Sequence, residues 1–420
     1  MNESTTMYEQ SGPAPASAAA PPREEHAVTS ATLSPEAIVA QVAPVIRQYA
    51  TQGERDRRLA PEVIEAMLDA GVFRAWVPRA LGGLEMDPVS AMRLFEGIAH
   101  ADGSAGWVAS NSVNATIAFQ AFPEAGARDV FADPRALIAG AIYPPGTAMP
   151  VDGGYRVSGQ WTTASGCHYA TTILTGALIM DGDTPRTDPD GHPVLMAVAL
   201  QRADIEIVEN WNTLGMRATG SHDLRAQDVF VPERRTATLG PTSFAEPNAA
   251  FGGPLYRIGL WLDMLRIAAT SVGIAQAALE AFIEMAQTKL PTGSQTPLAD
   301  QPVVQDQVAR AQARIEAGRA TVHHTTADAW AYVQGGERIT GDRGISQGLA
   351  TSFGVELAVE AVDIIQGVAG SSGFRAEQPF ERYFRDLHTL NQHVLASAAR
   401  FASLGKMILG RPSDFPFYYL

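Results

Sequence analysis

Apolar residues recur at helical spacing through the first part of the chain. Between Ile38 and Tyr49 they return every three or four positions, which predicts a helix with one buried face. Ser34, Pro35 and Glu36 precede this pattern and supply an N-cap hydroxyl, a proline where no N–H is needed, and an acid at the positive end of the helix dipole. The same period predicts helices over 61–70, 88–101 and 106–122, and a helical domain over residues 31–138.

The period changes to two after the turn Asp152-Gly153-Gly154. Apolar and polar side chains alternate over 155–161, as is typical of a half-buried strand. Short strands without intervening helices predict an antiparallel barrel or sandwich. Further strands are predicted at 173–180, 194–200, 205–208 and 224–231, which gives a central β domain over 139–238.

The helical pattern returns after Pro254. The segment 258–290 carries an almost continuous apolar band, so we expect this helix to be buried on more than one side. Long helices joined by short loops predict a bundle, and the fold class is therefore α+β in the order α, β, α. The other helices of the bundle, which we place over 249–410, are predicted at 303–333, 344–369 and 381–410.

Composition limits the possible partners. Residues 1–30 are rich in Pro, Ala, Ser and Glu and are predicted to be a disordered tail. The net charge of −14 argues against nucleic acid or an anionic membrane surface as partner. No apolar run approaches the ~20 residues that span a bilayer. The single cysteine, Cys167, cannot form an internal disulfide, which fits a reducing cytoplasm.

Six phrases, in this order, resemble the acyl-CoA dehydrogenase fold over about residues 35–409. The resemblance implies an N-terminal helical domain, a central antiparallel β-barrel or sandwich and a C-terminal four-helix bundle. The phrases are AGVFRAWVPRALGG (70–83), HADGSAGW (100–107), YRVSGQW (155–161), NWNTLGMRATGSHDLRAQDVFVPE (210–233), QGVAGSSGF (366–374) and PFERYFRD (379–386).

The segment after Arg385-Asp386 indicates which branch of this fold the chain resembles. Many dehydrogenases carry their catalytic glutamate a few residues after this pair, but Val394 stands near that place and no Glu follows Asp386. The pattern RDLHTLNQH instead resembles two-component flavin-dependent monooxygenases: phenol and steroid-phenol hydroxylases, dibenzothiophene monooxygenases and amino-sugar N-oxygenases. In that branch an Arg-Asp pair precedes a catalytic histidine, which maps to His393.

The resemblance also implies a flavin site. The segment WTTASGCHYA (161–170) is similar to the flavin loop of the branch, whose serine maps to Ser165. This hydroxyl would hold flavin N5 and the peroxide, while His393, titrating near neutrality, would deprotonate the substrate or donate a proton. Arg217 would bind a flavin phosphate, helped by the hydroxyls of Thr219 and Ser221. The remaining predicted flavin contacts are Tyr143 and Thr163, with Trp161 and Trp211 as aromatic walls.

The sequence indicates less about the substrate pocket than about the flavin site. Phenol hydroxylases of the branch carry a further histidine in the helix after the Gly-Trp pair, and here that helix has Asn111 and Asn114 instead. A phenol substrate is therefore in doubt, and we expect Trp107, both asparagines and His168 to line the pocket. No metal site is expected, because His388 and His393 would lie about 140° apart on a continuous helix.

Each candidate also has an ordinary structural interpretation. His393 could be a surface or hydrogen-bonded histidine, and Ser165 a turn residue beside Gly166. Arg217 could form a plain ion pair, and Trp211 could belong to the core.

The prediction is the oxygenase component of a two-component flavin-dependent monooxygenase. It would use reduced FMN or FAD from a separate NAD(P)H:flavin reductase, and O2, through a C4a-hydroperoxyflavin. It would oxygenate a small aromatic, heteroaromatic or amine substrate, as a homotetramer in the cytoplasm. One alternative is an FAD-dependent acyl-CoA dehydrogenase or oxidase, and another is a non-catalytic partner protein with a flavin-binding fold. The first alternative needs a carboxylate base such as Asp263, Glu280, Glu356 or Glu360.

Overall fold

The computed structural model describes residues 34–240, 243–244, 246–259 and 261–419. The predicted disordered tail, 1–30, lies outside the described residues. The first helix, α1 (Pro35–Asp56), begins as predicted, because the Ser34 hydroxyl accepts a 3.2 Å hydrogen bond from the Ala37 N–H. α2 (Pro61–Asp69) and α3 (Pro88–Ala101) also match the predicted helices.

The next helical segment is shorter than predicted. α4 (Gly103–Ala115) ends where a 3₁₀ segment, Thr116–Ala121, begins. A further helix, α5 (Glu124–Phe131), follows it and was not predicted. α4 begins at Asp102, whose carboxylate accepts a 2.9 Å hydrogen bond from the Ala105 N–H, so the acid caps this helix.

The central part of the chain forms one mixed sheet. Its strand order is β6-β7-β2-β1-β3-β5-β8, with β4 paired to β3. The pairs are antiparallel, as predicted, except that β1 and β3 are parallel. The strands are β1 (Ile138–Val151), β2 (Gly154–Ala164), β3 (Thr172–Asp181), β4 (Thr184–Pro185), β5 (Leu195–Gln201), β6 (Glu206–Val208), β7 (His222–Pro232) and β8 (Thr236–Leu239).

β1 is the longest strand and the sequence pattern did not indicate it. It contains Gly140, the pair Pro144-Pro145 and Gly146, which interrupt the alternation that predicts strands. Its pairing is interrupted at the same place, because the register with β3 shifts between Ala141 and Gly146. The break places part of β1 outside the hydrogen-bond ladder.

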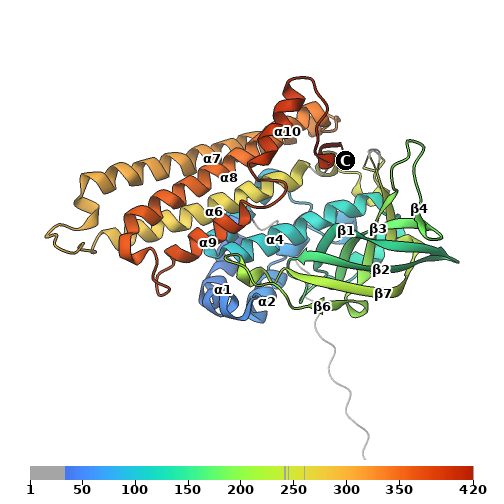
Figure 1. The fold of residues 1–420 in the computed structure, drawn as a ribbon, viewed down its shortest axis with the longest axis horizontal. Helices are drawn as coiled ribbons and strands as arrows, with labels where there is room; N and C mark the ends of the chain where they lie inside the picture. The colour runs from blue at the N-terminus through green and yellow to red at the C-terminus, as the bar shows by residue number, and fades with distance from the viewer. Residues whose placement is uncertain (1–33, 241–242, 245, 260, 420) are drawn as a thin grey trace, which may run out of the picture. The chain divides into compact units, whose positions relative to one another are not determined.

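The C-terminal part is helical. α6 (Trp261–Ala286), α7 (Pro302–Gln334) and α8 (Gly341–Ala369) lie alongside one another, and α4 reaches from beside them towards the sheet (Figure 1). α6 also packs closely on α3, where a Cβ added to Gly273 would lie 2.2 Å from the Glu96 carbonyl oxygen. By length and composition α6 could span a membrane, but 72% of its apolar window is buried inside the protein, as expected for a core helix.

The last predicted helix, 381–410, is in fact two helices. α9 (Phe380–Leu390) and α10 (Ala399–Ile408) are separated by a link that contains His393. In this link the Leu395 N–H donates to His393 Nδ1 at 3.3 Å, so a side chain takes the place of a helical carbonyl. His393 therefore does not lie on the same helix as His388, which bonds to Asp363 at 2.8 Å.

Candidate active site

A cavity of about 530 Å³ opens where α4, the first half of β1, the end of β2, the loop before β7, the start of α6 and the link after α9 meet. These segments are far apart in sequence and converge only in the folded chain. Of the predicted site residues, nine line this cavity. They are Trp107, Asn111, Tyr143, Thr163, Ser165, Trp211, Thr219, Ser221 and His393.

A row of hydrogen bonds runs along one wall of the cavity. Trp107 Nε1 donates to Ser165 Oγ at 2.9 Å, and Ser165 Oγ lies 2.7 Å from Ser221 Oγ. Ser221 Oγ lies 2.6 Å from Thr219 Oγ1, which donates at 2.8 Å to the Met216 carbonyl. Thr219 and Ser221 thus bond to the wall that holds Ser165.

His393 faces the same tryptophan. The rings of Trp107 and His393 are 5.1 Å apart at an interplanar angle of 65°, an edge-to-face contact. Burial, and secondly the nearby Arg266 cation, lower the pKa of His393 to about 4. The imidazole is therefore neutral at pH 7, in contrast to the expected titration near neutrality. Because Nδ1 accepts from the Leu395 N–H, the proton of the neutral ring lies on Nε2.

Arg266 is a site residue that the sequence reasoning missed. Its side chain is only 2% exposed, and its guanidinium lies 4.9 Å from the Trp107 ring centroid. It donates to Asp263 at 2.7 Å and to Asn111 Oδ1 at 2.9 Å. The signal was the Asp-x-x-Arg spacing inside an otherwise apolar helix, because buried charges need partners.

Two interrupted strands also line the cavity. Ile142 and Tyr143 lie in the break of β1, and Thr162 and Thr163 lie where the register of β2 with β7 shifts between Trp161 and Ala164. Thr163 has φ +62°, which is unusual for a β-branched residue. Such bulges re-aim backbone groups and are common beside active sites.

Four predicted site residues lie away from this cavity. Trp161 is fully buried and donates to the Gly176 carbonyl at 2.7 Å. Arg217 lies 3.4 Å from Glu54, in an ion pair. His168 lies 3.2 Å from Glu209 in a separate small pocket, and Asn114 lines a chamber that adjoins the main cavity.

The loop that carries Trp211 and Met216 is fixed from α9. Asp386 accepts a 2.5 Å hydrogen bond from the Met216 N–H, and the Thr389 hydroxyl accepts one of 2.9 Å from the Gly215 N–H. Gly215 allows this contact, because a Cβ there would lie 2.1 Å from the Arg385 carbonyl oxygen. The Arg-Asp pair therefore positions one wall of the cavity.

Of the four carboxylates that a dehydrogenase could use as its base, three are paired with a basic side chain and one is exposed on a helix. Asp263 lines the cavity but is held by Arg266. Glu280 bonds to His100 at 2.7 Å and Glu360 to Arg314 at 2.6 Å. Glu356 lies exposed on α8. Among the described residues of the cavity wall, none of these acids is a free base.

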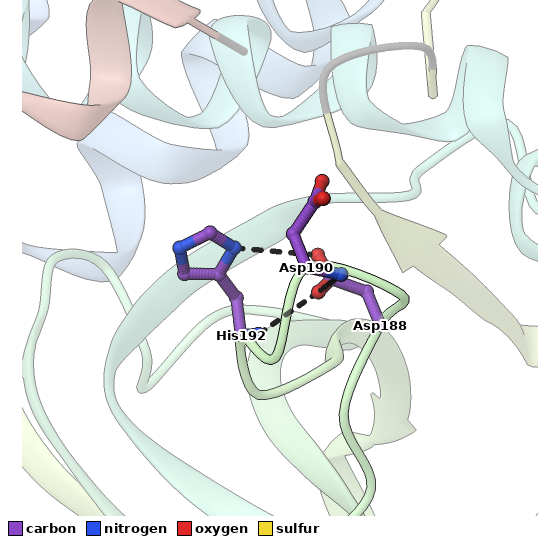
Figure 2. Close-up of side chains that lie close together, drawn as sticks. All are labelled: Asp188, Asp190 and His192. Carbon is purple, nitrogen blue, oxygen red and sulfur yellow. Dashed lines mark hydrogen bonds and ion pairs between the residues drawn. The ribbon is translucent and has the colours of Figure 1, made fainter.

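One group of His and Asp side chains in the described residues has spacing that would suit a metal ion. Asp188, Asp190 and His192 lie together on the exposed loop before β5 (Figure 2). Asp188 accepts from the backbone N–H of Asp190 at 2.9 Å and of His192 at 2.8 Å. These bonds stabilise the turn, and the group is remote from the cavity.

The comparisons with known proteins agree with this architecture. The acyl-CoA dehydrogenase N-terminal domain model matches residues 34–128, and the C-terminal domain model matches 265–398. Indole-3-acetate monooxygenase of Pseudomonas putida is 32% identical, covering 87% of this chain and 92% of that protein. The oxygenase component of FADH2-dependent resorcinol hydroxylase of Rhizobium sp. is 30% identical, covering 88% of this chain and 91% of that protein.

A solved structure shows the same fold. XiaF from Streptomyces sp., in complex with FADH2 and glycerol, is 25% identical and superimposes with a TM-score of 0.83, covering 91% of this chain and 97% of that one. The match extends through the helical parts and the sheet. The chain therefore belongs to the acyl-CoA dehydrogenase family and, within it, to the oxygenase components of flavin-dependent monooxygenases.

Proposed function

We propose that this protein takes reduced flavin from a separate NAD(P)H:flavin reductase and transfers one atom of O2 to a small aromatic or heteroaromatic substrate. Reduced FAD is the first candidate flavin, because the names of the resorcinol hydroxylase and of the XiaF complex both include FADH2. We also propose a cytoplasmic homotetramer. The observation that carries the proposal is the pairing of Ser165 and His393 around Trp107 in a cavity whose carboxylate, Asp263, is neutralised.

The residues present suit a flavin ring. A cavity of about 530 Å³ is within the usual range of ligand pockets, ~300–1,000 Å³. Its hydroxyl row and its interrupted strands offer hydrogen-bond partners to the edge of a planar ring. Ser165 would hold the ring near N5, and the backbone of Tyr143 and Thr163 would flank it. When bound, reduced flavin supplies the electrons that activate O2.

The protein's own residues then have distinct tasks. Trp107 and Met216 are buried and keep water from one wall of the cavity. His393 presents a neutral Nε2–H, so it donates a hydrogen bond to the oxygen atom being transferred without adding a positive charge. Arg266, which is paired with Asp263, donates to Asn111 Oδ1 and so fixes the Asn111 side chain in the cavity wall.

Two alternatives make different predictions. A dehydrogenase would need a carboxylate base, and Asp263 is held by Arg266 at 2.7 Å. A non-catalytic partner protein would not need the row of hydroxyls beside His393.

A direct experiment supplies chemically reduced FAD and ¹⁸O2 to the purified protein with a panel of small aromatic compounds. We expect a product with one ¹⁸O atom, and we expect this product to form without a reductase. We also expect His393→Ala to bind reduced FAD but to lose product. Oxidation of an acyl thioester without incorporation of oxygen would support the dehydrogenase instead.

A further inference from the structure

The hydroxyls of Ser165, Ser221 and Thr219 form a row on the cavity wall, the hydroxyl row. Only one arrangement of their hydrogens places a hydrogen in each short O···O contact. The Met216 carbonyl can only accept, so Thr219 Oγ1, at 2.8 Å, gives it its single hydroxyl hydrogen. Ser221, 2.6 Å from Thr219, must then donate to Thr219. Ser165, 2.7 Å from Ser221, must in turn donate to Ser221.

This order determines what Ser165 can offer to the cavity. Its hydrogen is directed at Ser221, and one of its lone pairs already accepts from Trp107 Nε1 at 2.9 Å. The remaining lone pair can only accept. The reverse order would leave Thr219 and the Met216 carbonyl as two oxygens 2.8 Å apart with no hydrogen between them. Thr219 and Ser221, the two inner residues of the row, are at most 4% exposed, so water has little access to replace a missing partner there.

We propose that Thr219 and Ser221 are positioning residues that set Ser165 as a hydrogen-bond acceptor and thereby make the site selective for reduced flavin. This inference rests on the proposed function. In the reduced ring N5 carries a hydrogen that Ser165 can accept. In the oxidised ring N5 presents a lone pair, which would face the lone pair of Ser165. If Ser165 donated to the oxidised ring, one of the three short contacts of the row would be left without a hydrogen.

Anaerobic titration of the flavin-free protein with reduced and oxidised FAD tests this selectivity by binding alone. The wild type is expected to bind reduced FAD about tenfold or more tightly, as for one hydrogen bond gained and one repulsive contact avoided. In Ser221→Ala and Thr219→Val the Ser165 hydroxyl is no longer held as an acceptor. The ratio of the dissociation constants of oxidised and reduced FAD should therefore fall about tenfold. Thr219→Ser, which keeps the hydroxyl, should restore it.

The control variant is Thr326→Val, which removes a buried hydroxyl that donates to Val322 O at 2.7 Å in α7, away from the cavity. It should leave the ratio unchanged. A test without mutation uses 5-deaza-FAD, which has carbon in place of N5 in both redox states. Because neither form has the N5 hydrogen bond or the N5 lone pair, the wild-type ratio of the oxidised and reduced dissociation constants should approach one. Unchanged ratios in the Ser221 and Thr219 variants, or a deazaflavin ratio equal to that of FAD, would overturn the inference. Failure of the wild type to bind FAD or FMN in either redox form would instead contradict the proposed function.

Discussion

Trp107 and Ser165 join helix α4 to the loop after β2 inside the cavity, where the indole N–H donates to the serine hydroxyl at 2.9 Å. The opposite side of the site depends on the same tryptophan, whose ring packs edge-to-face with His393. One side chain therefore sets the orientation of both predicted catalytic residues.

Trp107→Phe should keep the ring contact with His393 but remove the N–H that Ser165 accepts. With that bond lost, Ser165 is less well fixed, and we expect reduced flavin to be consumed with release of hydrogen peroxide rather than transfer of oxygen to the substrate. The ratio of product to hydrogen peroxide should fall about fivefold to tenfold, as expected for one net hydrogen bond. Trp76→Phe, in the core beside Phe95, is the control. An unchanged ratio in Trp107→Phe would contradict this role.

Arg266→Met should destabilise the fold, because it leaves the Asp263 carboxylate partly buried without its partner. Breaking a buried pair on one side typically costs about 3–5 kcal/mol. Replacing both residues, as Asp263→Asn with Arg266→Met, should recover much of the free energy of unfolding. Urea denaturation of the two variants measures this difference. Equal stability of the single and double variants would show that the pair is not coupled.

The His393 pKa leads to a pH prediction. Burial and the Arg266 cation lower the pKa of His393 to about 4, so the ring stays neutral from pH 5.5 to 8. The yield of oxygenated product per reduced flavin should therefore show no inflection near pH 6.5. The stability that this histidine contributes is present above its unfolded pKa of about 6.5 and is lost as pH falls towards 4. An inflection near 6.5 that disappears in His393→Gln would contradict the account.

Asp386 gives the opposite pH dependence of stability. Burial, followed by the charge of Asp102, raises the pKa of Asp386 to about 7. Between about pH 4 and 7 the folded state holds a proton that the unfolded state has lost, so stability falls as pH rises, by at most ~1.4 kcal/mol per pH unit. Asp386→Asn can still accept from the Met216 N–H and should remove this dependence. Urea denaturation at pH 5, 6, 7 and 8 compares it with the wild type, and equal slopes would reject the assignment.

The order of elements could be predicted from the sequence because it depends on local signals. The Ser34-Pro35 cap and the apolar period of α1 are examples. β1 could not, because Gly140 and Pro144 break the alternation that identifies strands. The interruption after α9 has no glycine or proline to indicate it, and it depends on the bond between the Leu395 N–H and the His393 ring.

The site was only partly predictable for a similar reason. Ser165 and His393 followed from short phrases that resemble a known branch of the fold, and both line the cavity. The contact between Ser221 and Ser165 did not, because it spans 56 residues of sequence and exists only in the folded chain. The ion pair of Arg217 with Glu54 did not follow from the sequence either, because it joins residues that are far apart in the chain.

The most direct test of the account is the fate of molecular oxygen. Purified protein is mixed anaerobically with chemically reduced FAD and one of a panel of small aromatic compounds, then exposed to ¹⁸O2, with no reductase or NAD(P)H present. We predict that at least one compound of the panel yields a product that carries one ¹⁸O atom, together with one equivalent of water and oxidised FAD. We also predict that His393→Ala forms hydrogen peroxide in place of product. Oxidised FAD and hydrogen peroxide alone, from the wild type with every aromatic compound of the panel, would contradict the proposed oxygen transfer.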